Sequence, residues 1–259
     1  MVLLYEVVDN IAILTMNRPE VRNSLNEELI IELINSLKRA GEEKEVRVIV
    51  LRSAGDKAFC AGADLGKLGE RSSANIIELR SYLGKYAILL RTFVEVGKPI
   101  IAAVQGYALA GGCGLAVACD LTVASEKAIF GVPEINIGFW EMMITAPVFR
   151  AIGMKKGLEL FYTGKQIDAF EAERIGMVNK VVPQDSFENA VMNLAKELAS
   201  KSPIAMSMGR EAFYTTRDME YGKAVKYLSE MVPILASTDD LREGISAFRE
   251  KRKPKWKGR

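Results

Sequence analysis

Apolar and polar positions at the start of the chain predict a β-hairpin followed by a helix. Two β-rich apolar runs, residues 2–8 and 11–16, flank the turn pair Asp9-Asn10. Polar residues 26–28 then precede a segment that extends to about Ala40 and carries leucine at positions four apart. That spacing places the leucines on one helical face, so we expect an amphipathic helix here.

The same alternation of short apolar runs and longer amphipathic segments continues along the chain. Residues 75–94 have the pattern of a second amphipathic helix, which ends before Pro99. Strands are expected at 46–51, 100–104 and 121–124, Gly-rich turns at 59–65 and 109–114, and a short helix from the second turn through residue 119. Because strands and helices alternate with short connections, the pattern predicts an α/β layered fold.

From about residue 188 onward the pattern is nearly all helical. Breaks are expected at residues 202–203, around 216–218 and at 237–239. We find no low-complexity linker between the two halves of the chain. We therefore expect an α/β core over residues 1–190 and a helical segment over residues 191–259.

Composition excludes several kinds of catalytic site. The chain is 49% hydrophobic and 26% charged, with a net charge of +2, so nothing global demands nucleic acid or an anionic membrane. It contains no histidine. Ser-His-Asp and Cys-His catalysis and His-ligated metal sites are therefore excluded. Acid–base chemistry must come from carboxylates, lysine, tyrosine or thiols.

Cysteine usage and hydropathy predict a cytoplasmic protein without a membrane span. Cys60, Cys113 and Cys119 are odd in number, lack C-x-x-C spacing and lie in apolar or Gly-rich surroundings, as expected of reduced, buried thiols. The first sixteen residues have no basic region and read as strands, so we expect no signal peptide. The most hydrophobic region, 100–124, is interrupted by glycines and is expected to be core.

The two Gly-rich turns are the features that most need a function. Such turns expose backbone N–H groups, and a following helix adds positive potential. They could simply be close-packed loops. Phosphate binding is a rival use, but neither turn has the G-K-[ST] of a P-loop or G-x-G-x-x-G spacing. Two donors converging from separate loops would suit a developing oxyanion.

The order and spacing of several motifs make the chain similar to the enoyl-CoA hydratase/isomerase (crotonase) superfamily. The matching segments are 17–19 with 23–25, 59–65, 98–104, 106–108, 111–113 leading to 119–120, 130–134, 160–164, 172–182, and 243–244 with 248–252. The resemblance implies a crotonase-like spiral of ββα units with a helical C-terminal region. It also implies assembly as a homotrimer or hexamer and an acyl-CoA thioester as substrate. Coenzyme A would then be part of the substrate, and no separate cofactor or metal is expected.

The resemblance assigns the centre of the site. It implies that the backbone N–H groups of Ala63 and Gly111 form an oxyanion hole for the thioester carbonyl, and that Glu134 is a catalytic acid/base. The first glutamate of the family's hydratases should stand where this chain has Gly114. Moving a double bond needs one base, whereas hydration conventionally uses two carboxylates. We therefore favour isomerisation of an enoyl- or dienoyl-CoA, with enoyl-CoA hydratase as the alternative and a catalytically poor CoA-binding protein as a third possibility.

Glu141 is a second candidate carboxylate. It lies in the loop after Glu134, where many relatives have a proline or small residues. Some members that isomerise dienoyl thioesters carry an aspartate close to this place. Apolar neighbours would raise the pKa of a buried Glu141, as a proton shuttle needs. A solvent-facing loop acid is the equal alternative, while Asp64 and Asp120 are expected to be structural.

Contacts with coenzyme A are implied at three segments. The resemblance places Val21, Arg22 and Ser24 in the first, and Cys60, Ala61, Asp64 and Leu65 in the second. Phe248 and Lys251 resemble positions that reach the CoA of a neighbouring subunit. Seven of the eleven residues 249–259 are Lys or Arg. A solvated tail would explain this charge, and without interleaved aromatics beyond Trp256 we expect no RNA-binding role.

Overall fold

The computed structural model describes residues 1–64 and 75–259, and it contains two sheets built by one repeated unit. The six-stranded sheet has the order β1-β2-β3-β5-β7-β10, and the four-stranded sheet has the order β4-β6-β8-β9. Their strands are β1 Leu3–Val8, β2 Ile11–Met16, β3 Val48–Ser53, β4 Ala58–Cys60, β5 Ile100–Val104, β6 Tyr107–Leu109, β7 Leu121–Ser125, β8 Ile129–Gly131, β9 Gln166–Asp168 and β10 Lys180–Val182. Only the β1–β2 and β8–β9 pairs are antiparallel among these strands.

Three successive turns of the chain each contribute one strand to each sheet and then a helix. β3 and β4 precede α3 (Ile76–Glu95), β5 and β6 precede α4 (Gly111–Ala118), and β7 and β8 precede α5 (Met142–Thr163). Within each sheet the successive strands pair in parallel. The expected spiral of ββα units is therefore confirmed.

The first two long helices begin where side-chain caps predict. Asn26 precedes α1 (Glu27–Glu42), and its side chain accepts a hydrogen bond of 2.9 Å from the Leu29 amide. Asn75 precedes α3 and accepts from the amides of Ile77 and Glu78, both at 3.0 Å. Each cap satisfies amides that a helix leaves without a partner in its first turn.

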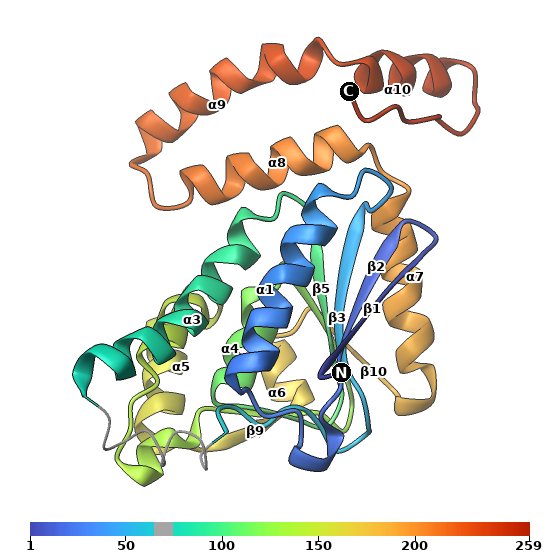
Figure 1. Ribbon diagram of the computed structural model, residues 1–259. Coiled ribbons are helices and arrows are strands. Elements are labelled where there is room, and N and C mark those ends of the chain that lie inside the picture. The colour runs from blue at the N-terminus through green and yellow to red at the C-terminus, as the bar shows by residue number, and fades with distance from the viewer. Residues whose placement is uncertain (65–74) are drawn as a thin grey trace.

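The six-stranded sheet separates two apolar layers. Residues such as Leu14, Ile49 and Ala102 face a large core shared with α1, α3 and α4. On the other face, residues such as Ile13 and Val50 pack against α7 (Phe187–Ala199), which Figure 1 shows alongside the sheet. α7 crosses the boundary expected at residue 190, and its buried side chains belong to the core. The division into a core and a helical segment at that residue stays a prediction.

Three further helices lie together at one end of the molecule (Figure 1). They are α8 (Pro203–Thr216), α9 (Tyr221–Ala236) and α10 (Asp239–Arg249). Asp120 joins α8 to the core, because its carboxylate accepts hydrogen bonds of 2.8 Å from Arg210 Nε and 2.7 Å from the Tyr214 hydroxyl. The same carboxylate accepts from the Ile100 amide at 2.8 Å. Asp120 is therefore a structural residue, as expected.

The basic tail is mostly exposed, but several of its side chains are held by polar contacts with the preceding helices. Arg252 pairs with Glu243 at 2.5 Å, and Arg259 pairs with Asp239 at 3.1 Å. The Trp256 indole donates to the Ser200 carbonyl at 2.7 Å. Much of the tail's positive charge is thus already matched by acidic side chains.

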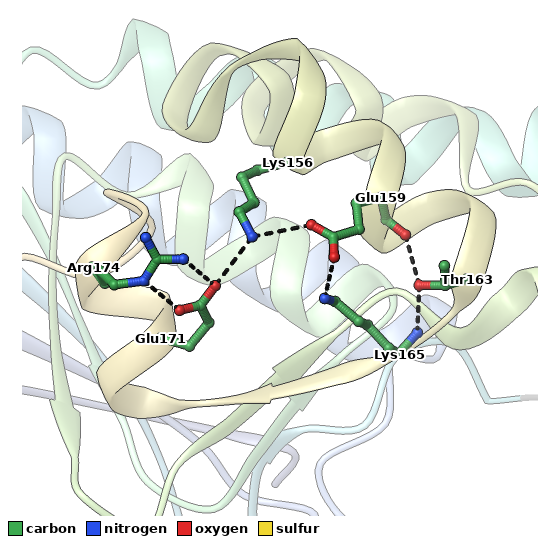
Figure 2. Close-up of polar contacts among 6 residues, drawn as sticks. All are labelled: Lys156, Glu159, Thr163, Lys165, Glu171 and Arg174. Atoms are coloured by element: carbon green, nitrogen blue, oxygen red, sulfur yellow. Dashed lines mark hydrogen bonds and ion pairs between the residues drawn. The ribbon is translucent and has the colours of Figure 1, made fainter.

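A surface network of charges holds α5 against α6 (Ala169–Arg174), as Figure 2 shows. Glu171 accepts two hydrogen bonds from Arg174, at 2.6 and 2.7 Å, and one of 3.3 Å from Lys156. The bonds from Arg174 are the main reason that the pKa of Glu171 falls to about 2. Glu159 links Lys156 to Lys165, which precedes β9. β9 pairs with β8, the strand that leads into Glu134.

The described chain also contains 3-10 helices at Pro19–Val21, Pro133–Ile137 and Gln184–Ser186. Within residues 1–64 and 75–259, no helix is both long enough and apolar enough to span a membrane.

Candidate active site

The two Gly-rich turns meet at the ends of neighbouring parallel strands. β4 ends at Cys60 and β6 ends at Leu109, and these strands pair directly. A methyl group added to Gly62 would lie 2.4 Å from Ala110 Cβ, and one added to Gly112 would lie 2.1 Å from the Cys60 carbonyl oxygen. Real side chains do not approach so closely, so glycine at these two positions permits the contact between the loops.

Each turn leaves one amide without an acceptor. The Leu25 N–H donates to the Gly62 carbonyl at 2.8 Å, and the Leu25 carbonyl accepts from the Asp64 N–H at 3.0 Å. The intervening Ala63 amide therefore points away from Leu25. Gly111 is the first residue of α4, where a helix leaves its amides unpaired. Neither the Ala63 nor the Gly111 N–H donates a hydrogen bond to the described part of the chain. Both residues line one cavity.

The turn before Gly111 is strained. Ala110 has φ 57° and ψ −133°, a conformation that glycine adopts far more easily than alanine. Its N–H donates to the Gly131 carbonyl at 2.9 Å, and its carbonyl accepts from Gly114 at 3.1 Å. These bonds hold the peptide between Ala110 and Gly111, which carries the free amide.

The cavity beside the two amides has a volume of about 60 Å³ and a mostly apolar wall. Glu141 is its acidic residue, and Tyr82 and Tyr86 are its hydroxyl-bearing residues. The lining is Leu25, Ile30, Ala63, Tyr82, Leu83, Tyr86, Gly111, Phe139, Glu141 and Met143.

Glu134 is a buried carboxyl group for which the described part of the chain provides no hydrogen-bond partner. It follows Pro133 at the end of β8 and is only 8% exposed. Neither of its carboxyl oxygens accepts a hydrogen bond from residues that the structure describes. Burial raises the pKa of Glu134 from 4.5 to about 7, because the charged form loses its hydration and the nearby backbone N–H of the same residue offsets this loss only in part. The group can therefore exchange a proton near neutral pH.

Glu141 is the second carboxyl group with this property, and it is not a solvent-facing loop acid. It lines the cavity, and burial raises its pKa to about 7, with a further contribution from the charge of Glu134. Trp140 fixes the loop, since its ring lies 5.0 Å from that of Phe161 and its N–H donates to Thr145 at 3.1 Å. Thr145 in turn donates to the Glu141 carbonyl at 3.3 Å.

The place of a side chain at residue 114 is occupied by two others. A Cβ added to Gly114 would lie 2.1 Å from Ile144 Cγ2 and 2.8 Å from the Tyr86 hydroxyl. Glycine is thus required at this position by packing. The sequence pattern did not single out Tyr86 or Ile144, because each reads as an ordinary apolar-face residue of its helix.

The segments expected to contact coenzyme A lie side by side. The Ala61 amide donates to the Arg22 carbonyl at 3.1 Å, and Asp64 pairs with Arg18 at 3.5 Å. Val21 is partly exposed, whereas the Ser24 hydroxyl is tied to the Val21 carbonyl at 2.7 Å. The Cys60 side chain is fully buried, which raises its thiol pKa to about 12. Leu65 lies outside the described residues.

Phe248 and Lys251 are not part of this cavity. Phe248 is 85% exposed on α10, and Lys251 follows that helix with φ 53°. α10 lies at the end of the molecule away from the chain's own Gly-rich turns (Figure 1). The single chain does not bring these two residues to Ala63 and Gly111.

Comparisons with known proteins identify the family of this chain. The family model described as enoyl-CoA hydratase/isomerase matches residues 6–259. The 2,3-dehydroadipyl-CoA hydratase of Escherichia coli is 36% identical over 96% of both chains, and the short-chain-enoyl-CoA hydratase of Clostridium acetobutylicum is 35% identical over 96% and 95%. A crystal structure of enoyl-CoA hydratase from Bacillus anthracis superposes with a TM-score of 0.94, at 33% identity over the full length of both chains. The chain therefore belongs to the enoyl-CoA hydratase/isomerase family.

Proposed function

We propose that this protein is an enoyl-CoA hydratase, which adds water across the double bond of a 2-enoyl-CoA thioester. The observation that carries the proposal is a pair of carboxyl groups, Glu134 and Glu141, whose pKa values burial raises to about 7, with the charge of Glu134 adding to the shift at Glu141. Glu141 lines the same cavity as Ala63 and Gly111, whose amides donate no hydrogen bond to the described part of the chain. The names of the similar proteins, which specify hydratase, support the same reaction.

The residues divide the work as follows. The Ala63 and Gly111 amides donate to the thioester oxygen and stabilise the enolate charge that develops there. One carboxylate removes a proton from water while the water oxygen bonds to C3, and the C2=C3 electron pair moves toward the thioester. A carboxyl group then delivers a proton to C2. Because two like charges in an apolar site repel each other, the pair favours one ionised and one protonated member.

This proposal replaces our first preference for isomerisation, which rested on Gly114. A glutamate at 114 is not the only way to supply a second carboxylate, because Glu141 enters the cavity from the loop before α5. One-base isomerisation by Glu134 remains the second candidate, since Glu134 alone has the required burial and pKa.

Product analysis with 2-enoyl-, 3-enoyl- and dienoyl-CoA thioesters separates the candidates. A hydratase accumulates 3-hydroxyacyl-CoA, and both Glu134→Gln and Glu141→Gln lower its turnover by roughly 10² to 10⁴. A one-base isomerase returns deuterium from C2 to C4 and is nearly indifferent to Glu141→Gln. Glu32→Gln, on an exposed face of α1, is the control. Isomerisation without hydration in the wild type would refute the hydratase proposal, and no turnover of any thioester would favour the binding protein.

We also propose that the protein assembles as a homotrimer or hexamer in which Phe248 and Lys251 reach a neighbouring subunit's CoA. α8 and α9 contain no buried residue in the single chain. Each of the three last helices exposes a large apolar side chain: Phe213 on α8, Val232 on α9 and Phe248 on α10. Contact with another copy would cover such surfaces. Light scattering at micromolar concentration tests this assembly, and a monomer would refute both the oligomer and the shared site.

A further inference from the structure

Tyr86 is one of the two residues that occupy the space left by Gly114, and it is the one with a polar group there. It lies on α3, is 6% exposed and lines the cavity that contains Ala63, Gly111 and Glu141. Its hydroxyl would be 2.8 Å from a Cβ at residue 114 and 3.5 Å from one at residue 111. The phenol oxygen therefore lies over the first turn of α4, within the volume that a side chain at 114 would need.

The hydroxyl is oriented by a single strong contact. It donates to the Gly111 carbonyl oxygen at 2.6 Å. A phenol has one proton to donate and two lone pairs that accept. Since the proton is used on Gly111, what the hydroxyl has left to offer is acceptance of hydrogen bonds.

We propose that the Tyr86 hydroxyl binds the water that attacks C3, in place of a carboxylate on residue 114. This inference rests on the proposed hydratase function. The bound water donates one hydrogen to the Tyr86 oxygen and the other to whichever of Glu134 and Glu141 is ionised. Both water hydrogens are then held, and an oxygen lone pair is free to bond to C3.

The surroundings suit this role. A water molecule needs roughly 10–15 Å³ of cavity volume, and the cavity offers about 60 Å³. Desolvation and, next, the charge of Glu141 raise the pKa of Tyr86 well above 10, so the phenol keeps its proton. Tyr86 therefore gains and loses no proton in the reaction. The water proton passes to a carboxylate and from there a proton reaches C2.

Tyr86→Phe tests the proposal, because it removes the hydroxyl and keeps the ring. We expect kcat for hydration of a 2-enoyl-CoA to fall roughly ten- to hundredfold, between the loss of an ordinary hydrogen bond and that of an oxyanion donor. KM should change less than about twofold, since the thioester contacts remain. Exchange of the C2 protons of a saturated acyl-CoA with D₂O should stay within about twofold, because it needs the base and the amides but no attacking water.

Tyr5→Phe is the matched control. It also removes a phenol that donates to an oxygen, at 2.5 Å to Glu43, but on β1 outside the cavity. A Tyr86→Phe variant whose kcat for hydration equals that of the wild type would overturn the inference about Tyr86 alone. An equal fall in hydration and in proton exchange would also overturn it, because the hydroxyl would then act through the Gly111 peptide or the fold. Proton exchange without hydration in the wild type would instead overturn the hydratase function on which the inference rests.

Discussion

Replacing Glu134 by glutamine removes one titration from the folded protein, so its effect on stability must change with pH. The carboxyl group is 8% exposed, has no hydrogen-bond donor in the described chain, and has a pKa of about 7 against 4.5 for an unperturbed glutamate. At about 1.4 kcal/mol for each pH unit, this gap corresponds to about 3 kcal/mol of difference between the folded and unfolded states.

The sign follows from proton binding. Between pH 4.5 and 7 the folded protein keeps the Glu134 proton while the unfolded chain has lost it. The unfolded state thus binds fewer protons, and stability falls as the pH rises through this window. Glutamine does not titrate. The stability of Glu134→Gln relative to wild type should therefore rise by roughly 2–3 kcal/mol between pH 5 and pH 8, whatever constant offset the substitution adds.

Urea unfolding at pH 5 and pH 8 measures this change. Protein concentration must be the same in every sample, because assembly would add to apparent stability. Glu32→Gln, on an exposed side chain of α1, should leave the stability difference independent of pH. A difference between Glu134→Gln and wild type that is constant within about 0.5 kcal/mol would refute the reasoning, because it would show that Glu134 is hydrated in the free protein.

Three other substitutions and one control probe packing at the site and at the contact between α8 and the core. Gly114→Ala should destabilise the protein by about 1–3 kcal/mol in urea unfolding and lower turnover, because its Cβ meets Ile144 and Tyr86. Ala110→Gly should leave stability unchanged or raise it by up to about 1 kcal/mol, since it relieves a positive φ. Asp120→Asn should lower the free energy of unfolding by about 3–5 kcal/mol, because it leaves the nearly buried Arg210 without its charged partner. The control Glu95→Gln removes a partner of Arg91 in an exposed pair and should lower it by less than about 1 kcal/mol. Equal effects of the last two would contradict the anchoring of α8 by Asp120.

Local sequence patterns determined the elements because their causes are local. The hairpin at residues 2–16 follows from two apolar runs around Asp9-Asn10. The helices α1 and α3 each begin after an asparagine whose side chain accepts hydrogen bonds from amides of the first turn. The glycines at 62 and 112 marked the turns, since only a missing side chain permits their contact. The catalytic role expected of Glu134 came from the resemblance of its motif to the family, and Pro133 begins the 3-10 helix that carries Glu134 after β8.

Only the tertiary structure decided the state of the two carboxyl groups and the meaning of Gly114. Burial raises the pKa of Glu134 and of Glu141 to about 7, and the charge of Glu134 adds to the shift at Glu141; this burial depends on elements brought together from distant parts of the chain. Sequence made Glu141 equally consistent with a loop acid and a site residue, because the fixing of its loop by Trp140 depends on Phe161. In the sequence, Gly114 suggested that a hydratase carboxylate is missing. In the structure, the missing side chain leaves the space into which Ile144 and Tyr86 pack. Such packing joins three helices, and no spacing within any one of them encodes it.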